Sequence, residues 1–266
     1  GEQLSARPAG AEQFRALLQA LRFAPQDAEM LAAALANKPA AIGFAALDSQ
    51  AAIPLLRQAQ DAKIPVIAFD SGVDSDIPVA TAATDNLAAS ALAADKMAEL
   101  IGGSGEIALV VHSQTSRTGI DRRDGFVNRI AEKYPDIQIV ATEYGDGDQL
   151  KSTEITKAIL AANPDIKGIF GANEGSAIGV LNGVREMGSK VVVIGYDSGA
   201  AQKAAIRDGT MAGAITQNPV GIGYETVKAA VAAAKGETVP KSIDTGFFWY
   251  DKTNIDSPEI AAVLYD

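Results

Sequence analysis

The stretch Val191-Val-Val-Ile-Gly-Tyr-Asp-Ser-Gly199 indicates the fold of this chain. It begins with an apolar, mostly β-branched run in which no polar residue alternates. That pattern is typical of a strand buried on both faces, as in a parallel sheet covered by helices. The run ends at Asp197, which a small residue and a glycine follow. Open α/β sheets bind ligands at this end of their strands, so we expect Asp197 to lie at a binding site.

An earlier stretch ends in the same way. Ile64-Pro-Val-Ile-Ala-Phe-Asp-Ser-Gly72 also runs from apolar residues into an aromatic residue, Asp70, a serine and a glycine. We find no repeat of short period, so the duplication is at the scale of a lobe. The two endings therefore predict two similar halves that face a shared cleft.

Between and beyond these stretches, strand-like and helix-like segments alternate. The predicted strands are 41–45, 66–69, 106–111, 137–142, 166–171, 191–196, 211–216 and 247–250. The predicted helices are 11–21, 27–35, 51–62, 85–101, 119–134, 149–162, 174–187, 200–208 and 221–235. This alternation favours an α/β fold with βαβ units and parallel sheets flanked by helices. Right-handed crossovers then place the strand ends on one side.

Composition limits the possible partners. The chain has 266 residues, of which 47% are hydrophobic and 21% are charged, which is normal for a folded protein of one large domain or two lobes. The formal net charge is −10, so nucleic acid is a poor partner, because phosphate binding needs clustered Lys and Arg. No basic amphipathic stretch suggests membrane contact, and no apolar run approaches the roughly 18 residues of a membrane span.

Metal and catalytic chemistry find little support. The chain has no cysteine and one histidine, His112, so we expect no metal site. As a catalytic base, His112 would need a nucleophile and an orienting carboxylate, and no Gly-x-Ser-x-Gly turn is present. We therefore prefer an ordinary histidine at a strand end. No phosphate-binding loop or dinucleotide fingerprint is present, so we also expect no cofactor.

Planar polar side chains remain at the predicted strand ends. They are Asp70, Asn173, Asp197, Gln217 and an arginine in the loop 113–123. Each offers two donors or acceptors in one plane, which matches two neighbouring hydroxyl groups of a sugar or polyol. Helix capping or a turn is the alternative role for each. For Asn173 and Asp197, which open predicted helices, capping is expected and does not exclude contact with a ligand.

Several segments, in their order and spacing, carry a resemblance to a known family. They are Lys38-Pro-Ala-Ala-Ile-Gly-Phe44 with Leu47-Asp-Ser49, Ile64-Pro-Val-Ile-Ala-Phe-Asp70, Thr84-Asp-Asn86, Arg122-Arg-Asp-Gly-Phe126, Ile169-Phe-Gly-Ala-Asn-Glu174, Val193-Ile-Gly-Tyr-Asp197 and Ile206-Arg-Asp-Gly-Thr-Met-Ala-Gly-Ala-Ile-Thr-Gln-Asn-Pro219. From about Asp27 to Asp251, the chain resembles a ribose-type periplasmic sugar-binding protein, the soluble receptor of an ABC importer.

The resemblance implies two Rossmann-like lobes, a hinge that the chain crosses several times and a ligand between the lobes. The expected crossings are Gly102–Gly105, Lys235–Pro240 and a point after Asp251. The N-terminal lobe would then contain residues 1–103 plus 237–251, and the C-terminal lobe residues 104–236 plus 252–266.

The resemblance also implies ligand contacts, carried over motif by motif. They fall on Asp70, Asn173, Asp197, Gln217 and the loop arginine Arg122, with Arg117 as a substitute for a further arginine that ribose receptors place at Ile120. The family begins with a strand, a loop of aromatic residues, a helix and a second strand. We find no version of that unit in residues 1–26, so we expect an atypical or incomplete N-terminus.

The function implied is binding without catalysis. A monomeric periplasmic receptor would hold a monosaccharide or polyol and deliver it to an ABC permease in the membrane. No secretion signal is recognisable at Gly1, which fits a mature exported protein and a cytosolic one equally.

Three alternatives remain. One is the effector-binding domain of a lac-repressor-type regulator, which the acidic charge and the absence of a recognisable helix-turn-helix disfavour. The others are a small α/β hydrolase or dehydrogenase, and a receptor remodelled at its N-terminus that no longer binds sugar.

Overall fold

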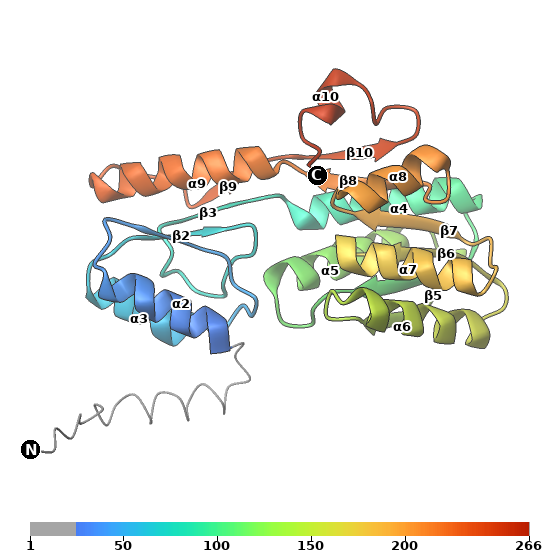
Figure 1. Cartoon of the computed structure of the whole chain (residues 1–266), viewed down its shortest axis with the longest axis horizontal. Coiled ribbons are helices and arrows are strands. Elements are labelled where there is room, and N and C mark those ends of the chain that lie inside the picture. Colours follow the sequence, from blue (N-terminus) through green and yellow to red (C-terminus); the bar gives the residue numbers. More distant parts are fainter. Residues whose placement is uncertain (1–24, 266) are drawn as a thin grey trace, which may run out of the picture.

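The computed structural model describes residues 25–265 of the chain. They form two lobes that lie side by side, each built around its own sheet (Figure 1). One sheet has four strands in the order β1-β2-β3-β9, and the other has six in the order β10-β8-β7-β6-β4-β5. The predicted α/β fold, with mainly parallel sheets flanked by helices, is confirmed. The predicted helix 11–21 lies outside the described residues.

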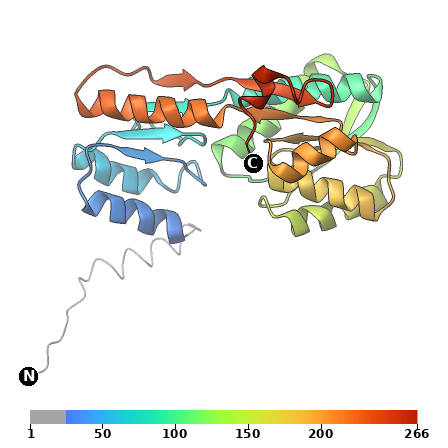
Figure 2. The ribbon, with the colours of Figure 1, turned by 45° about the horizontal axis from the view of Figure 1, so that its top comes forward.

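The first lobe is a three-layer sandwich. Its parallel strands are β1 (Ile42–Phe44), β2 (Val66–Phe69), β3 (Ala80–Ala83) and β9 (Ser242–Asp244). Helices α2 (Pro25–Ala36) and α3 (Ile53–Asp61) cover one face, and α9 (Pro219–Ala234) covers the other (Figure 2). Adjacent residues of β2 point to opposite faces of the sheet. Val66 packs with Leu55 of α3, whereas Ile67 packs with Ala229 of α9.

The second lobe repeats this plan with a larger sheet. Its strands are β4 (Gly105–Val111), β5 (Ile137–Tyr144), β6 (Ile166–Gly171), β7 (Val192–Tyr196), β8 (Gly213–Gln217) and β10 (Phe247–Asp251), of which only β10 is antiparallel to its neighbour. Helices α4 (Asn86–Ile101) and α5 (Arg117–Lys133) pack on one face, and α6 (Gln149–Ala162), α7 (Glu174–Glu186), α8 (Ala200–Asp208) and the short α10 (Pro258–Ala261) pack on the other.

The expected hinge positions and lobe boundaries are wrong. The chain instead passes between the sheets from β3 to α4, from β8 to α9 and from β9 to β10. Residues 25–83 and 219–244 therefore belong to the first lobe, and 86–217 and 247–265 to the second.

The reason is the packing of two alanine-rich helices. Met97 of α4 packs against Ile107 and other residues of the six-stranded sheet, so α4 lies in the second lobe. The glycines that suggested a crossing only end this helix, where Gly102 has a left-handed φ of 78° and caps it. In the same way, α9 packs on the first sheet through Ala229.

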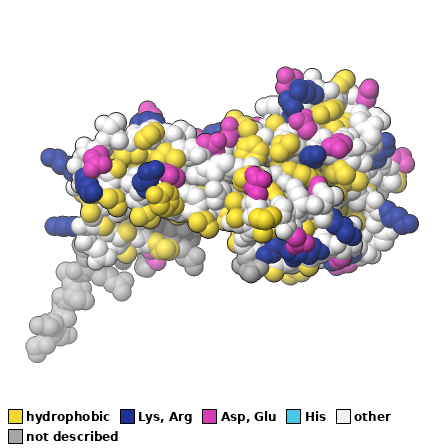
Figure 3. All heavy atoms as spheres, turned by 90° about the horizontal axis from the view of Figure 1, so that it is seen from above, with side chains coloured by type: hydrophobic (Ala, Val, Ile, Leu, Met, Phe, Trp, Pro, Cys, Tyr) yellow, Lys and Arg dark blue, Asp and Glu magenta, His cyan; other side chains and the backbone are white. Residues whose placement is uncertain are grey.

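Two features of the first lobe have no covering element in the described part of the chain. Strand β1 is at an edge of its sheet and pairs only with β2. The outer face of α9 exposes Val220, Tyr224 and Val227, which are 72%, 66% and 63% exposed, and apolar side chains show on that side of the lobe (Figure 3). None of the described helices combines the length and apolar character needed to cross a membrane.

Candidate functional site

The repeated Asp-Ser-Gly endings take the same conformation in the two lobes. Asp70 follows β2 and Asp197 follows β7, and their φ angles of 55° and 75° both lie in the left-handed region. Asp and Asn adopt this region more readily than other non-glycine residues. Each aspartate also donates its backbone N–H to the neighbouring strand, to Ala82 O at 3.0 Å and to Ile215 O at 2.7 Å. In both lobes, the backbone therefore turns at an aspartate at the carboxyl end of a strand.

A cavity of about 630 Å³ lies between these strand ends. Both aspartates line it, as the sequence predicted for a shared cleft. Arg122 and Asn173 contribute from the second lobe, as does Gln217 at the end of β8, just before the crossing to α9. Five of the six predicted site residues thus meet at one cavity; whether they contact a ligand is still a prediction.

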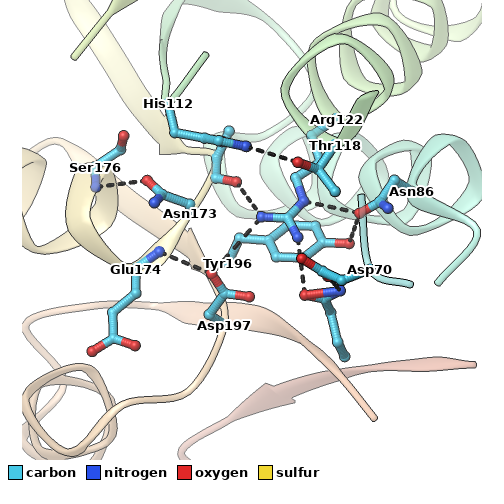
Figure 4. Close-up of polar contacts among 12 residues, drawn as sticks. Asp70, Asn86, His112, Thr118, Arg122, Asn173, Glu174, Ser176, Tyr196 and Asp197 are labelled. Carbon is cyan, nitrogen blue, oxygen red and sulfur yellow. Dashed lines mark hydrogen bonds and ion pairs between the residues drawn. The ribbon is translucent and has the colours of Figure 1, made fainter. Parts of the chain in front are cut away.

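Arg122 is the central charge of the cavity, although its side chain is only 4% exposed. Its Nε donates to Asn86 Oδ1 at 2.9 Å, Nη1 to Ala172 O at 2.9 Å and Nη2 to Gln217 Oε1 at 3.0 Å (Figure 4). The guanidinium carbon lies 3.7 Å from the centroid of the Tyr196 ring. These contacts fix the plane of the guanidinium group.

The environment also keeps Arg122 charged. Burial alone would lower the pKa of its guanidinium, but Tyr196, Asp197 and Asp70 together raise that pKa above its ordinary value. A buried, permanently charged planar donor is therefore available at the wall of the cavity.

Gln217 connects the two lobes at the site. Its Oε1 accepts from Arg122, and its Nε2 donates to Asp70 Oδ1 at 2.9 Å. Because Asp70 belongs to the first lobe and Arg122 to the second, this amide bridges the cleft. A ligand with hydroxyl groups has the right chemistry to join or replace these bonds, since a hydroxyl both donates and accepts.

Asn173 and Asp197 combine structural roles with groups that face the cavity. Asn173 caps α7, where its Oδ1 accepts from Ser176 N at 2.9 Å, so its amide nitrogen is the group it can offer to a ligand. Asp197 Oδ2 accepts from Glu174 N at 3.1 Å and lies 3.8 Å from Arg122 Nη1. Burial raises the pKa of Asp197, and the charge of Arg122 opposes that rise only in part.

Arg117, the remaining predicted contact, does not line the cavity. Its Nη1 donates to Asp74 Oδ1 of the first lobe at 3.3 Å, and its Nη2 pairs with Asp121 one turn along its own helix. Close by, Ser49 N donates to Thr115 O at 2.9 Å, again across the lobes. Arg117 starts α5 at the point where the lobes touch, so its position suits it for joining the lobes rather than for reaching a ligand in the cavity.

His112 lines the same cavity but has no catalytic arrangement around it. Its Nε2 lies 3.1 Å from Thr118 Oγ1. Burial and the charge of Arg122 lower the pKa of His112 to about 3, so the ring is neutral near neutral pH and a weak base. In the described part of the chain, no group of three or more His, Asp or Glu side chains is placed to hold a metal ion.

Sequence reasoning did not single out Ser71, Asn86 or Tyr196 as site residues. Ser71 lines the cavity, and its buried Oγ has no hydrogen-bond partner among the described residues. Asn86 and Tyr196 contact Arg122 from behind. Ser71 and Tyr196 adjoin the predicted site residues Asp70 and Asp197, and Asn86 ends the segment Thr84-Asp-Asn86, but only the three-dimensional contacts show their roles.

Comparison with known proteins agrees with this geometry. Residues 16–238 match the sequence profile described as a periplasmic binding protein domain. The chain belongs to the periplasmic binding protein family. Similarity to two ribose import binding proteins confirms the resemblance to ribose-type members.

Relatives within the family bind sugars, according to their names. The ribose import binding protein of Haemophilus influenzae is 31% identical over 181 residues, which are 68% of this chain and 61% of that protein. The D-allose-binding periplasmic protein of Escherichia coli is 30% identical over 210 residues, or 75% of this chain and 67% of that protein. A solute-binding protein of an ABC transporter from Agrobacterium vitis, solved with bound D-fucose, has a TM-score of 0.87 at 34% identity and covers 92% of this chain and 86% of its own.

The match to the curated relatives is partial in length. The chain spans 61–64% of the ribose import binding proteins that it matches in Haemophilus influenzae and Escherichia coli.

Proposed function

We propose that this periplasmic binding protein is a sugar receptor of an ABC importer, located in the periplasm and monomeric. It binds a monosaccharide or polyol between its lobes, without catalysis, and presents the closed complex to a membrane permease. The observation that carries the proposal is the convergence of planar donors and acceptors from both lobes on one cavity: the partly buried Asp70 from the first lobe, and the buried Arg122 with the partly buried Asp197 and Gln217 from the second.

The size and the unsatisfied groups of the cavity support this function. A volume of about 630 Å³ is within the usual range for small-molecule sites. Ser71 Oγ is buried at its wall without a partner in the described residues, and a buried unpaired hydroxyl costs roughly 1–3 kcal/mol. A ligand hydroxyl that bonds to Ser71 would remove this cost.

A sugar screen tests the proposal. We expect at least one of D-ribose, D-allose, D-arabinose, D-fucose and D-tagatose to raise the melting temperature, with a Kd in the micromolar range or below by calorimetry, which corresponds to about −8 kcal/mol. Failure of all five sugars, and of a wider panel of pentoses, hexoses and polyols, would contradict it.

A pair of serine variants locates the binding. Ser71→Ala should weaken sugar binding about fivefold or more and leave the melting temperature of the sugar-free protein unchanged or higher, because it removes an unpaired buried hydroxyl. Ser90→Ala is the matched control, since Ser90 Oγ is equally buried and without a partner in the described residues but lies on α4, outside the cavity. Equal affinities for the two variants would place the sugar elsewhere.

A further inference from the structure

Arg122 is oriented by two residues that do not line the cavity. Asn86 and Tyr196 are 5% and 0% exposed, and both lie against the Arg122 side chain (Figure 4). Asn86 Oδ1 accepts from Arg122 Nε at 2.9 Å, and the ring of Tyr196 supports the guanidinium face at 3.7 Å. Asn86 therefore does not reach the cavity itself, and Arg122 is the cavity residue to which its side chain bonds.

Asn86 is itself held on both sides of its amide. Its Oδ1 also accepts from the Tyr196 hydroxyl at 2.8 Å, and its Nδ2 donates to Thr84 O at 3.1 Å. Both oxygen lone pairs are thus occupied by oriented donors. Asn86 is also the first residue of α4, directly after the crossing from β3, so the hinge backbone sets the position of its amide.

The choice of an amide has an electrostatic consequence. An amide oxygen accepts the Nε–H without cancelling the positive charge, which a carboxylate at the same place would do. The positive charge of Arg122 therefore acts on groups in the cleft. One of these groups is Asp197, whose Oδ2 lies 3.8 Å from Arg122 Nη1. A preorganised charged donor binds a ligand more tightly, because less rotational freedom is lost on binding.

We infer that Asn86 is a positioning residue for sugar binding: together with the Tyr196 hydroxyl, it holds the Arg122 guanidinium in the orientation that the cavity uses. This inference rests on the proposed function, since the effect is on a sugar bound at Arg122. It assigns to the Thr84-Asp-Asn86 segment a role in affinity without contact to the ligand.

A double-mutant cycle tests the inference, with the sugar of the panel above that gives the largest thermal shift as the probe. Asn86→Ala should raise its Kd about tenfold in the wild-type background but less than twofold in an Arg122→Met background, because the oriented group is then gone. Ser90→Ala, on the same helix, should leave the Kd unchanged. Equal effects of Asn86→Ala in both backgrounds would overturn the inference.

Two conservative variants separate positioning from folding. Asn86→Asp keeps an oxygen acceptor for Arg122 Nε but adds a negative charge beside the guanidinium, so it should bind the sugar more tightly than Asn86→Ala and less tightly than wild type. Tyr196→Phe removes only the hydroxyl, keeps the stacked ring, and should weaken binding by less than Asn86→Ala does. Binding by Asn86→Asp as weak as by Asn86→Ala would count against an acceptor role.

A sugar-free measurement distinguishes this inference from the proposed function. In urea unfolding, Asn86→Ala and Arg122→Met should lower stability less together than the sum of their separate effects, because they share one hydrogen bond. Coupled unfolding with no sugar binding by the wild type would refute the receptor function and the sugar-binding role of Asn86. Additive unfolding, with sugar binding intact, would refute the positioning role alone.

Discussion

At the scale of single residues, the partly buried Asp197 affects the pH dependence of stability. Burial raises the pKa of its carboxyl, so the folded state takes up a proton more readily than the unfolded state does. Stability linked to this group is therefore fully present below the ordinary pKa of the unfolded chain and is lost as the pH rises through the raised pKa of the folded state. Above that raised pKa, the ionised Asp197 carboxylate costs the sugar-free protein stability.

Asp197→Asn tests this effect. The substitution removes the buried charge, and asparagine tolerates the left-handed φ of 75°, so we expect a higher melting temperature without sugar. Sugar affinity should fall about 10- to 100-fold, because a charge-assisted hydrogen bond is worth roughly 1.5–3 kcal/mol. Scanning calorimetry and titration calorimetry measure the two effects, and unchanged sugar affinity would remove Asp197 from the ligand contacts.

His112 gives an opposite pH dependence. Its pKa is lowered from the model-peptide value of 6.5 to about 3, so between these pH values the unfolded chain binds the proton and the folded protein does not. The stability that this group contributes is present above pH 6.5 and is lost as the pH falls toward 3. At pH 5 the loss relative to pH 7 should be about 2 kcal/mol, at about 1.4 kcal/mol per pH unit.

His112→Gln is the test of that assignment. The variant should lose less stability than wild type between pH 7 and pH 5 in urea unfolding, because glutamine does not titrate. Parallel pH profiles for the two proteins would show that another group causes the acid sensitivity.

At the scale of elements, the sequence predicted local structure better than tertiary placement. The strands of the second sheet have long apolar runs and were found close to their observed bounds. Strands β3 (Ala80–Ala83) and β9 (Ser242–Asp244) were missed, since one contains only alanine and threonine and the other is three residues long. Neither shows the β-branched run that marks a buried strand.

The placement of helices α4 and α9 shows what sequence reasoning lacked. Both are rich in alanine, and their spacing says which face is apolar but not which sheet that face covers. The clustering of Asp70, Asn173, Asp197 and Gln217 was predictable because parallel strands share one functional edge. Arg117 and Arg122 are five residues apart on one helix, so spacing alone could not say which of them faces the cavity.

The ion pair between Arg117 and Asp74, which joins the two lobes, is also testable. Arg117 at the start of α5 pairs with Asp74, and both side chains are substantially exposed, at 40% and 36%. Such a pair contributes about 0–1 kcal/mol. It exists only while the lobes touch, so Asp74→Asn should weaken sugar binding up to about fivefold, through faster dissociation.

Salt dependence and a matched control complete this test. The effect of Asp74→Asn should shrink at high ionic strength, because exposed charges are screened. Asp256→Asn is the control, since Asp256 pairs with Arg207 within the second lobe. A change of equal size for Asp256→Asn would mean that the effect comes from net charge rather than from the contact across the cleft.

At the scale of the whole molecule, the proposed function makes ligand binding and lobe closure one equilibrium. The bridge from Arg122 through Gln217 to Asp70 and the contact of Ser49 with Thr115 both require closed lobes. A sugar that contacts both lobes binds only that state and shifts the population toward it. At a free concentration of 100 times the Kd, it stabilises the closed state by about 2.7 kcal/mol, enough to reverse a tenfold preference for the open state.

Fluorescence energy transfer between the lobes can observe this shift. Helices α3 and α6 lie on the same side of the two lobes (Figure 1). The chain has no cysteine, so Gln58→Cys on α3 and Ala158→Cys on α6, both at exposed positions, would carry the only labels. We expect transfer efficiency to rise with sugar concentration and to saturate with the calorimetric Kd. The same labels in an Arg122→Met background should report no change at those concentrations. If calorimetry shows sugar binding while the transfer efficiency stays constant, the lobes are already closed without ligand. A permease could then not distinguish the sugar-bound protein from the sugar-free protein by lobe closure.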